Sequence, residues 1–225
     1  MVTRTLPDVP SEVLRSMYDG TTTLGAIGPV LAEALYRTVR REAPRHVVEV
    51  GMACGASTIA ILTALEENGG DGRLVSIDPY QHENWLGQGV ANVEKSGLGH
   101  RHHLIEEFDY LALADLLRQG LEVDFAYIDG RHNFDYALLD FFFLDKMLRI
   151  GALVGFNDCH YPAVEKVVSF VTKHRRYDEE DVGLPPRRIV RARWHRLVGR
   201  WVNTNDRYFR KRESWEPDPK FYVAF

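Results

Sequence analysis

The run VVEVGMACGAS, residues 47–57, constrains the fold of this chain more than any other segment. Its first residues are mostly β-branched and favour a strand. Gly51 and Gly55 then interrupt the pattern, and the helix-forming stretch 58–65 follows. A strand, a glycine turn and a helix form a unit that cradles nucleotides in α/β proteins, because glycine lets the backbone pass close to a ligand. The alternative interpretation is a tight turn in an α/β domain that binds no ligand.

The acidic residue in this run indicates the kind of ligand. A dinucleotide-binding fingerprint reads G-x-G-x-x-G and receives a pyrophosphate, whereas this chain has Glu49 at the first position and the spacing E-x-G-x-x-x-G. A carboxylate there repels phosphate and attracts a cation. S-adenosylmethionine (SAM) carries a sulfonium and an ammonium group and no phosphate. The sequence therefore predicts SAM as the cofactor and disfavours a nicotinamide-dependent oxidoreductase.

A second acidic residue follows the next predicted strand. The segment LVSI, residues 74–77, ends at Asp78. A carboxylate at the end of the second strand of such a unit can accept hydrogen bonds from ribose hydroxyls. An aspartate before Pro79 is also common as a turn residue, but the two segments together favour a nucleoside site.

Predicted strands alternate with predicted helices along the chain. This order implies right-handed crossovers and a mostly parallel sheet with buried strands. We expect strands at 46–50, 74–78, 102–106, 123–129 and 152–157, and helices at 11–19, 29–42, 58–65, 87–95, 111–118, 136–148 and 163–174.

Composition limits the class of protein. The 225 residues, 45% of them hydrophobic, suit one domain. No apolar run approaches the roughly 20 residues that span a bilayer, and the first residues lack the apolar segment of a signal peptide. Only Cys54 and Cys159 occur, so a disulfide framework is absent. We therefore expect a cytoplasmic protein with no membrane span.

The order of the motifs resembles that of the class I SAM-dependent methyltransferases. Within them the chain looks like the small O-methyltransferases of the catechol and caffeoyl-CoA type, with bacterial macrocin, rhamnosyl and cephalosporin-biosynthesis relatives. The motifs are VVEVGMACGAS, LVSIDPY, VDFAYIDGRHNF and MLRIGALVGFNDCH. The resemblance runs from about residue 25 to about residue 172.

This resemblance implies an α/β, Rossmann-like, doubly wound fold with a mostly parallel seven-stranded sheet and an antiparallel last strand. It implies one domain over residues 1–225. The parts are N-terminal helices in 1–44, a cofactor-binding core in 45–175, a basic insertion or lid in 185–219 and the closing antiparallel strand in 220–225.

The resemblance also assigns contacts with SAM. The implied cofactor-binding residues are Glu49, Gly51, Met52, Gly55, Ser57, Asp78 and Asp129. Relatives usually have Gly-Asp near the adenine, whereas this chain has Glu107-Phe108-Asp109. We therefore predict that Phe108 stacks on the adenine ring.

Oxygen-bearing side chains follow the fourth and fifth predicted strands, and ligands of open α/β sheets bind beyond the carboxyl ends of strands. By resemblance to the catechol type, Asp129, Asn157 and Asp158 are the metal ligands, and their oxygens suit Mg²⁺. Such an ion would lower the pKa of a substrate hydroxyl. The family usually has an acid where this chain has Asn157, so a weaker site or none follows. The alternative is that Asn157 and Asp158 cap a turn.

His132, three residues after Asp129, takes the place of the lysine base of the catechol type. An imidazole with a reference pKa of about 6.5 removes protons well near neutrality. We therefore predict His132 and Asp129 as the catalytic residues, with His160 as a second candidate base. The alternative is a histidine that only anchors its loop.

The segment from Arg187 to Arg212 is strongly basic, and its only acidic residue is Asp206. Apolar residues at helical spacing predict an amphipathic helix over 187–201. This helix could act as a lid or dimer element, touch an anionic partner or lie on a membrane surface. It could equally pack on its own domain with a solvated basic face.

Three functions compete. The first is an O-methyltransferase acting on a small hydroxylated metabolite, with or without a metal, in a pocket lined by aromatic residues such as Tyr80, Trp85 and Tyr161. The second is a SAM-binding module without catalysis, and a homodimer is compatible with either. The third is a nucleic-acid methyltransferase. Base methylation uses an (N/D)-PP-(Y/F) run, where this chain has Ile128-Asp129-Gly130-Arg131, so the sequence argues against nucleic acid.

Overall fold

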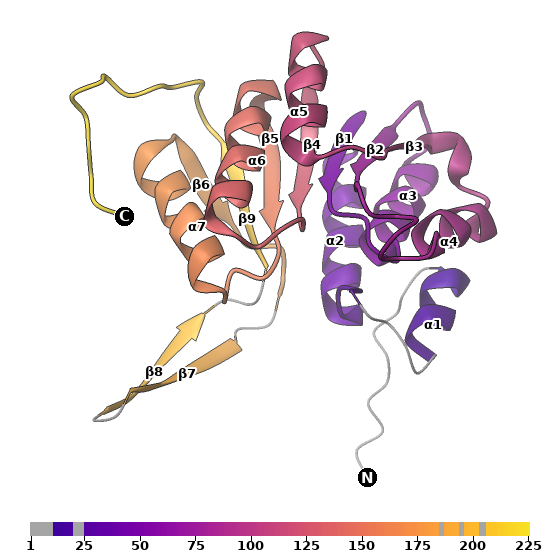
Figure 1. The fold of residues 1–225 in the computed structure, drawn as a ribbon, viewed down its shortest axis with the longest axis horizontal. Coiled ribbons are helices and arrows are strands. Elements are labelled where there is room, and N and C mark those ends of the chain that lie inside the picture. The colour runs from indigo at the N-terminus through magenta and orange to yellow at the C-terminus, as the bar shows by residue number, and fades with distance from the viewer. Residues whose placement is uncertain (1–10, 20–24, 185–186, 194–195, 203–205) are drawn as a thin grey trace.

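A seven-stranded sheet forms the centre of the molecule (Figure 1). The computed structural model describes residues 11–19, 25–184, 187–193, 196–202 and 206–225, and for 187–193 and 196–202 it describes the backbone alone. The strand order is β3-β2-β1-β4-β5-β9-β6. The strands are β1 (His46–Val50), β2 (Arg73–Ile77), β3 (His102–Ile105), β4 (Val123–Ile128), β5 (Leu148–Phe156), β6 (Tyr177–Glu180) and β9 (Arg207–Lys211). Within this sheet β9 runs opposite to the other six strands, antiparallel to both of its neighbours, β5 and β6. The predicted fold class is therefore confirmed.

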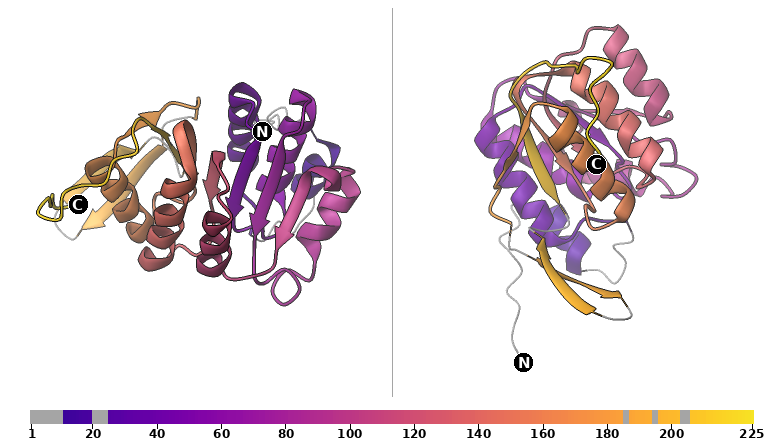
Figure 2. Two further views of the ribbon diagram at one scale, coloured as in Figure 1. Left: turned by 90° about the horizontal axis from the view of Figure 1, so that it is seen from above. Right: turned by 90° about the vertical axis from the view of Figure 1, so that its left-hand side faces the viewer.

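Helices cover both faces of the sheet, which lies between them when seen from above (Figure 2). One layer contains α1 (Glu12–Asp19), α2 (Pro29–Glu42), α3 (Ala56–Asn68) and α4 (Gln88–Ser96), and the other contains α5 (Asp109–Arg118), α6 (Phe134–Met147) and α7 (Pro162–His174). A short 3₁₀ helix, Gly99–Arg101, precedes β3.

The alternation of side chains along the strands divides the core into two parts. Val47 and Phe125 pack with the layer of α1 to α4, and their neighbours Val48 and Ala126 pack with the layer of α5 to α7. This is the two-residue period of a strand whose faces are both covered. Helix α3 is buried along residues 56–65, because it lies between the sheet and α2. Packing against the sheet and against α2 therefore fixes the position where α3 begins, at the glycine turn.

The antiparallel strand is β9, and not the segment 220–225 to which the sequence assigned it. That placement is wrong, because Tyr208 and Phe209 of β9 are buried in the sheet while residues 221–225 lie outside it. The rings of Phe221 and Phe225 pack instead against His174 of α7, with centroids 5.5 and 5.2 Å away. Both segments have an apolar pattern that suits a strand, so the pattern alone does not distinguish them.

The helix predicted over 187–201 is also wrong. The backbone there forms the antiparallel pair β7 (Arg187–Arg193) and β8 (Arg196–Val202), as Figure 1 shows below the sheet. Short basic segments with scattered apolar residues match the helical and the strand period almost equally well. The side chains of β7 and β8, which form part of the predicted lid, lie outside the described residues.

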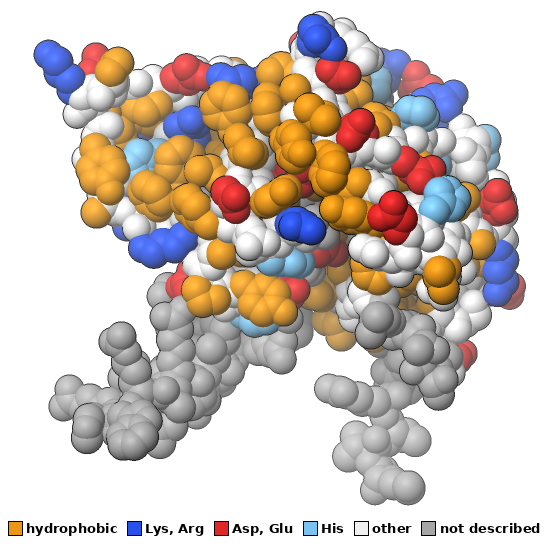
Figure 3. Space-filling model, viewed as in Figure 1, with side chains coloured by type: hydrophobic (Ala, Val, Ile, Leu, Met, Phe, Trp, Pro, Cys, Tyr) orange, Lys and Arg blue, Asp and Glu red, His pale blue; other side chains and the backbone are white. Residues whose placement is uncertain are grey.

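Exposed hydrophobic side chains gather on α5 and α6, and Figure 3 shows a broad hydrophobic area on this face. They include Leu111, Leu139 and Phe142.

Within the described ranges the structure contains no helix with the length and hydropathy of a membrane span. The predicted homodimer stays a prediction.

Candidate functional site

Gly51 lies where the end of β1 meets the end of β4. Its φ angle is +88°, and a Cβ at this position would lie 2.1 Å from the backbone oxygen of Asp129. Backbone hydrogen bonds fix this approach: the Gly51 N–H donates to Ile77 at 2.9 Å, and the Asp129 N–H donates to Val50 at 2.8 Å. Only glycine tolerates both this dihedral angle and this distance. The first glycine of the motif therefore joins the strand ends that carry the site.

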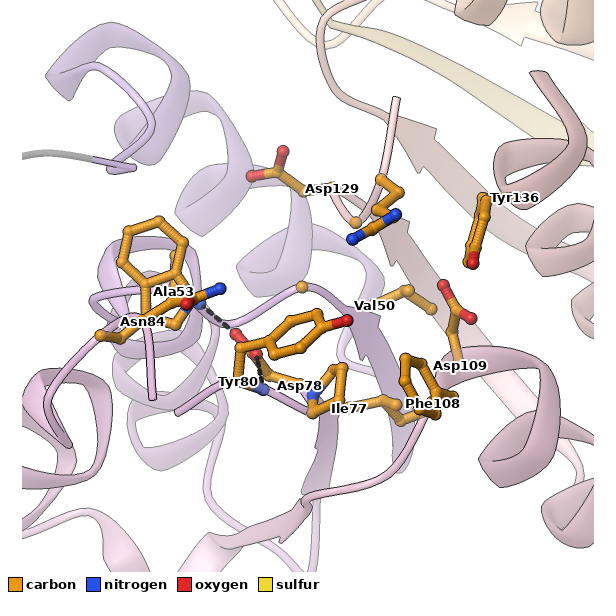
Figure 4. A pocket seen from close by; sticks show the side chains of 15 residues that line it. Val50, Ala53, Ile77, Asp78, Tyr80, Asn84, Phe108, Asp109, Asp129 and Tyr136 are labelled. Carbon is orange, nitrogen blue, oxygen red and sulfur yellow. Dashed lines mark hydrogen bonds between the residues drawn. The ribbon is translucent and has the colours of Figure 1, made fainter. Parts of the chain in front are cut away.

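The carboxylate of Asp78 holds the glycine turn from the end of β2. Its Oδ2 accepts hydrogen bonds from the backbone N–H groups of Met52 at 3.2 Å and Ala53 at 2.8 Å. Its Oδ1 accepts one from the backbone N–H of Tyr80 at 2.9 Å, and Figure 4 shows Asp78 with its hydrogen bonds to Ala53 and Tyr80. The buried Gln81, which the sequence did not predict, donates to the backbone oxygen of Ala53 at 2.7 Å. The predicted ribose-binding acid thus also shapes the turn.

Glu49 is fully buried beneath the turn and does not line either cavity described below. Its Oε2 accepts hydrogen bonds from the hydroxyls of Thr58 at 2.7 Å and Ser76 at 2.6 Å. Burial raises the pKa of Glu49 to about 7, although these hydrogen bonds oppose the shift. Three other predicted cofactor contacts are also absent from the lining of both cavities: Met52, Gly55 and Ser57.

A first cavity, which we call the turn cavity because the glycine turn lines it, opens beyond the carboxyl ends of β1, β2 and β4 (Figure 4). Four predicted site residues line it: Gly51, Asp78, Phe108 and Asp129. The ring of Phe108 packs edge-on against Tyr80, with centroids 6.0 Å apart, and stacks on Tyr110 at 5.4 Å. The cavity therefore combines an aromatic wall with a carboxylate, which suits a nucleoside.

Arg131 brings a positive charge to the turn cavity, and the sequence did not predict this. Its guanidinium carbon lies 5.3 Å from the ring centroid of Tyr136 and 5.9 Å from that of Tyr80. Contacts of this kind between a cation and aromatic faces are attractive. Burial raises the pKa of the nearby Asp109, and the charge of Arg131 opposes that shift. A basic group, Arg131, and an acidic group, Asp109, thus line the part of the cavity away from Asp78.

A second cavity adjoins the turn cavity. Both are lined by Ala53, Trp85, Asp129 and Gly130. The second cavity adds the loop before α2, the first turn of α2 and the polar side chains that follow β4 and β5: Gly25, Ala26, Ile27, Gly28, Leu31, His132, Asn157 and Asp158. The structure therefore brings the predicted catalytic and metal-binding residues to one place.

His132 lies between two carboxylates in the second cavity. Its Nε2 is 3.5 Å from Oδ1 of Asp129 and 3.6 Å from Oδ2 of Asp158. Burial lowers the pKa of His132, but the two carboxylates outweigh this effect and raise the pKa above its ordinary value. Burial raises the pKa of Asp129 to about 6, and the contact with His132 opposes that shift. His160 is farther along, with Nδ1 3.4 Å from Oδ1 of Asp158.

The backbone of Asp158 is held in an unusual conformation. Its φ angle is +51°, which is sterically unfavourable for a residue with a Cβ. Such strain persists where the surrounding structure demands it and is common at functional sites. Here it turns the chain sharply between β5 and α7 and places the carboxylate beside His132.

The metal site is the part of the prediction with the weakest support in the geometry. The described part of the chain contains no group of three or more histidine, cysteine, aspartate or glutamate side chains arranged to hold an ion. An imidazole lies between the two predicted carboxylate ligands, Asp129 and Asp158. The arrangement fits a histidine paired with two acids better than a cation cage. Mg²⁺ therefore stays a prediction.

Comparisons with known proteins agree with this geometry. A family model described as a methyltransferase domain matches residues 48–159. A flavonoid 3',5'-methyltransferase of Vitis vinifera is 28% identical over 119 residues, which are 51% of this chain and 47% of the relative. A putative caffeoyl-CoA O-methyltransferase of Arabidopsis thaliana is 27% identical over 118 residues, 51% of this chain and 46% of the relative. The chain thus spans about half the length of the curated relatives it matches.

Solved structures share the fold over nearly the whole chain. The O-methyltransferase TomG of Streptomyces achromogenes, in complex with SAM, has a TM-score of 0.67 and 17% identity, and the match covers 90% of this chain and 91% of TomG. An O-methyltransferase of Bacillus cereus in complex with S-adenosylhomocysteine (SAH) has a TM-score of 0.66 and 16% identity, with 89% of each chain covered.

We predict that Gly51→Ala destabilises the protein by about 2–4 kcal/mol, because the added Cβ meets the backbone of Asp129 and the positive φ angle is strained. Gly120→Ala is the matched control, since Gly120 has a φ angle of +75° but no atom within 4 Å of an added Cβ. It should cost about 1 kcal/mol. Urea unfolding of both variants measures the difference, and equal losses would contradict the close approach.

The raised pKa of Glu49 predicts a pH-dependent stability. The folded protein holds the proton of Glu49 up to about pH 7, whereas the unfolded chain loses it near its ordinary value of about 4.5. The stability contributed by this proton is therefore lost as pH rises between those values.

Glu49→Gln keeps a neutral side chain at every pH, so its stability relative to the native protein should rise between pH 5 and pH 8, by about 2 kcal/mol. Urea unfolding of the ligand-free protein at several pH values measures the effect. Glu94→Gln, on the exposed side of α4, is the control. An identical pH profile for Glu49→Gln and the native protein would show that Glu49 is not a neutral buried acid.

Proposed function

Because this chain belongs to the class I SAM-dependent methyltransferases, we propose that it transfers the methyl group of SAM to a hydroxyl oxygen of a small acceptor. The observation that carries this proposal is the junction of the two cavities at Asp129 and Gly130, with His132 in the second cavity only. A cofactor in the turn cavity and an acceptor in the second cavity would meet there. Asp129 borders both.

The turn cavity suits SAM for physical reasons. Oδ1 of Asp78 accepts one protein hydrogen bond, and a carboxylate oxygen can accept another from a ribose hydroxyl. Phe108 offers an aromatic face for the adenine ring. The negative charges of Asp78 and Asp129 favour a cationic ligand over a phosphate. Glu49 contributes by supporting the turn, because its own hydrogen bonds are to Thr58 and Ser76.

SAM, when bound, supplies an electrophilic methyl group on a cationic sulfur. The chain's own residues would prepare the acceptor. His132, in its neutral form, would accept the hydroxyl proton at Nε2 while the oxygen forms its bond to the methyl carbon, and the bond between that carbon and sulfur would break with its electron pair left on SAH. Asp129 and Asp158, at 3.5 and 3.6 Å, stabilise the imidazolium that results. The proton then rests on His132 until solvent removes it.

The acceptor that fits best is a hydroxylated aromatic molecule. Trp85 lines both cavities, and the ring of Tyr161 lies 5.3 Å from that of His132. Aromatic side chains bind flat apolar rings well. The names of two relatives refer to a flavonoid and to caffeoyl-CoA, and both types of acceptor have phenolic hydroxyls. These considerations favour the enzyme over a SAM-binding module without catalysis.

We expect Asp78→Ala to weaken SAH binding by at least tenfold, since it removes a carboxylate that binds the turn and faces the cofactor. One hydrogen bond to a charged group is worth roughly 1.5–3 kcal/mol. Isothermal titration calorimetry measures this loss. Asp71→Ala, which removes an exposed partner of Arg45, is the control and should bind normally. Native affinity in Asp78→Ala would place the cofactor elsewhere.

His132→Ala should lower methyl transfer by about 10²–10⁴-fold, the usual contribution of a positioned base, with SAH binding unchanged. Radiolabelled SAM with caffeoyl-CoA and a polyhydroxylated flavonoid as acceptors gives the rate. The native rate should rise with pH beyond the ordinary imidazole range, because the pKa of His132 is raised. His82→Ala, at an exposed histidine, is the control. An unaltered rate in His132→Ala would transfer the role to His160.

A further inference from the structure

Asp129, Asn157 and Asp206 follow one another across three neighbouring strand ends. In the sheet Ile128 of β4 pairs with Phe156 of β5, and Phe156 pairs with Arg207 of β9. One position farther toward the site, the register therefore places Asp129, Asn157 and Asp206 side by side. Because β9 is antiparallel, its beginning lies at the carboxyl ends of the parallel strands. The C-terminal part of the chain thus brings a carboxyl group to the site.

The carboxyl group of Asp206 is buried and bonded through both oxygens. Its side chain is 2% exposed. Oδ2 accepts a hydrogen bond from the hydroxyl of Tyr127 at 2.7 Å, and Oδ1 accepts one from Nδ2 of Asn157 at 2.9 Å. Burial raises the pKa of Asp206 to about 8, and with a proton on Oδ2 the atom Oδ1 still accepts from Asn157. The contact with Asn157 is therefore the same for the charged and the neutral acid.

These contacts determine which way the amide of Asn157 points. Nδ2 donates to Asp206 at 2.9 Å and to the hydroxyl oxygen of Tyr127 at 3.3 Å. An amide nitrogen has two hydrogens, so both are used on this side. The oxygen Oδ1 must then face the opposite side, where Asn157 lines the second cavity with His132. Asn157 is also among the groups that raise the pKa of His132.

We propose that Asp206 is a positioning residue of the methyl-transfer site: it fixes the amide of Asn157 so that the oxygen, and not the nitrogen, faces His132 and the acceptor hydroxyl. This inference rests on the proposed function. An amide oxygen accepts a hydrogen bond from the acceptor hydroxyl or from the imidazolium and holds it in place. A reversed amide would present N–H groups to a donor and oppose the same arrangement.

The surroundings of Tyr127 show that its hydroxyl is placed by the packing of the sheet. Gly155 of β5 pairs with Tyr127 on one side and Tyr208 on the other. A Cβ on Gly155 would lie 2.9 Å from the Tyr127 ring and 2.7 Å from the Tyr208 ring, so the two rings cover this glycine. The hydroxyl of Tyr208 makes no hydrogen bond within the described structure. Two buried tyrosines of similar setting thus differ in their contact with Asp206.

That difference supplies a matched pair of variants for nuclear magnetic resonance of the side-chain amides. The Asn157 signal is identified by its loss in Asn157→Asp. In the native protein its hydrogens should exchange slowly, with the one bonded to Asp206 shifted downfield. Tyr127→Phe should remove the slow exchange of the amide hydrogens. Asp206→Ala should remove the downfield shift. Tyr208→Phe should leave the signal unchanged. An Asn157 amide that is indifferent to Asp206→Ala overturns the proposal.

The exchanged pair Asn157→Asp with Asp206→Asn provides a second test, because it keeps the volume and the charge while reversing the hydrogen bond. Asn157→Asp alone places two buried acids in contact and should lower the melting temperature, and the exchanged pair should recover most of that loss. It should also recover methyl transfer to caffeoyl-CoA or the flavonoid, which Asp206→Ala lowers by about tenfold. No recovery in the exchanged pair would contradict direct contact between the two side chains.

Calorimetric titration with SAH separates this inference from the proposed function. Each of these variants should bind SAH within about twofold of the native protein, since Asp206 and Tyr127 do not line the turn cavity. If the native protein does not bind SAH, the proposed function fails, whatever the amide signals show. If SAH binds and the Asn157 amide does not respond to Asp206, only the positioning role fails.

Discussion

The whole site depends on the close approach of Gly51 to the backbone of Asp129. An added Cβ would lie 2.1 Å from the Asp129 oxygen, so the ends of β1 and β4 touch without a side chain between them. This contact lets the turn after β1 and the loop after β4 line a common space. The turn cavity and the second cavity meet at this point. A bulkier residue at position 51 would separate the strand ends and divide the site.

A concentration of buried acids follows from that geometry. Glu49, Asp129 and Asp206 all lie near the carboxyl ends of central strands, and burial raises the pKa of each, to about 7, 6 and 8. Acids placed together away from water repel each other unless they are protonated or meet a cation. In the proposed function a cationic cofactor and the imidazolium of His132 would supply such charge. The electrostatics of the ligand-free site therefore favour the chemistry proposed for it.

Residues far apart in the sequence complete the second cavity. The loop before α2 contributes Ile27 and Gly28, the loop after β4 contributes His132, and the turn after β5 contributes Asn157. Asp206, at the beginning of β9, accepts a hydrogen bond from the side-chain amide of Asn157. The strand that distinguishes this sheet from a fully parallel one is thus the strand that brings Asp206 to the site. Its antiparallel direction is a functional as well as an architectural feature.

The sequence by itself determined the α/β class and the alternation of β1 to β5 with helices along the chain, because these elements have local apolar patterns and β1 to β4 are each followed by a glycine or an acid. The strand β1 and the helix α2 have the predicted limits. It also predicted that Asp78, Asp129, His132 and Asp158 follow strand ends, and all four line a cavity at the carboxyl edge. Those predictions needed only the rule that such ends share one edge of the sheet.

Only the tertiary structure decided which apolar segment closes the sheet and which way each polar side chain faces. The segment 220–225 is the more apolar of the two candidates, but it is 207–211 that lies buried between β5 and β6. Glu49 was expected in contact with the cofactor, whereas hydrogen bonds to Thr58 and Ser76 hold it beneath the turn. Asp206 was visible in the sequence as the single acid of a basic segment. Its contact with Asn157 spans 49 positions, and no local pattern encodes a contact that depends on the register of three strands.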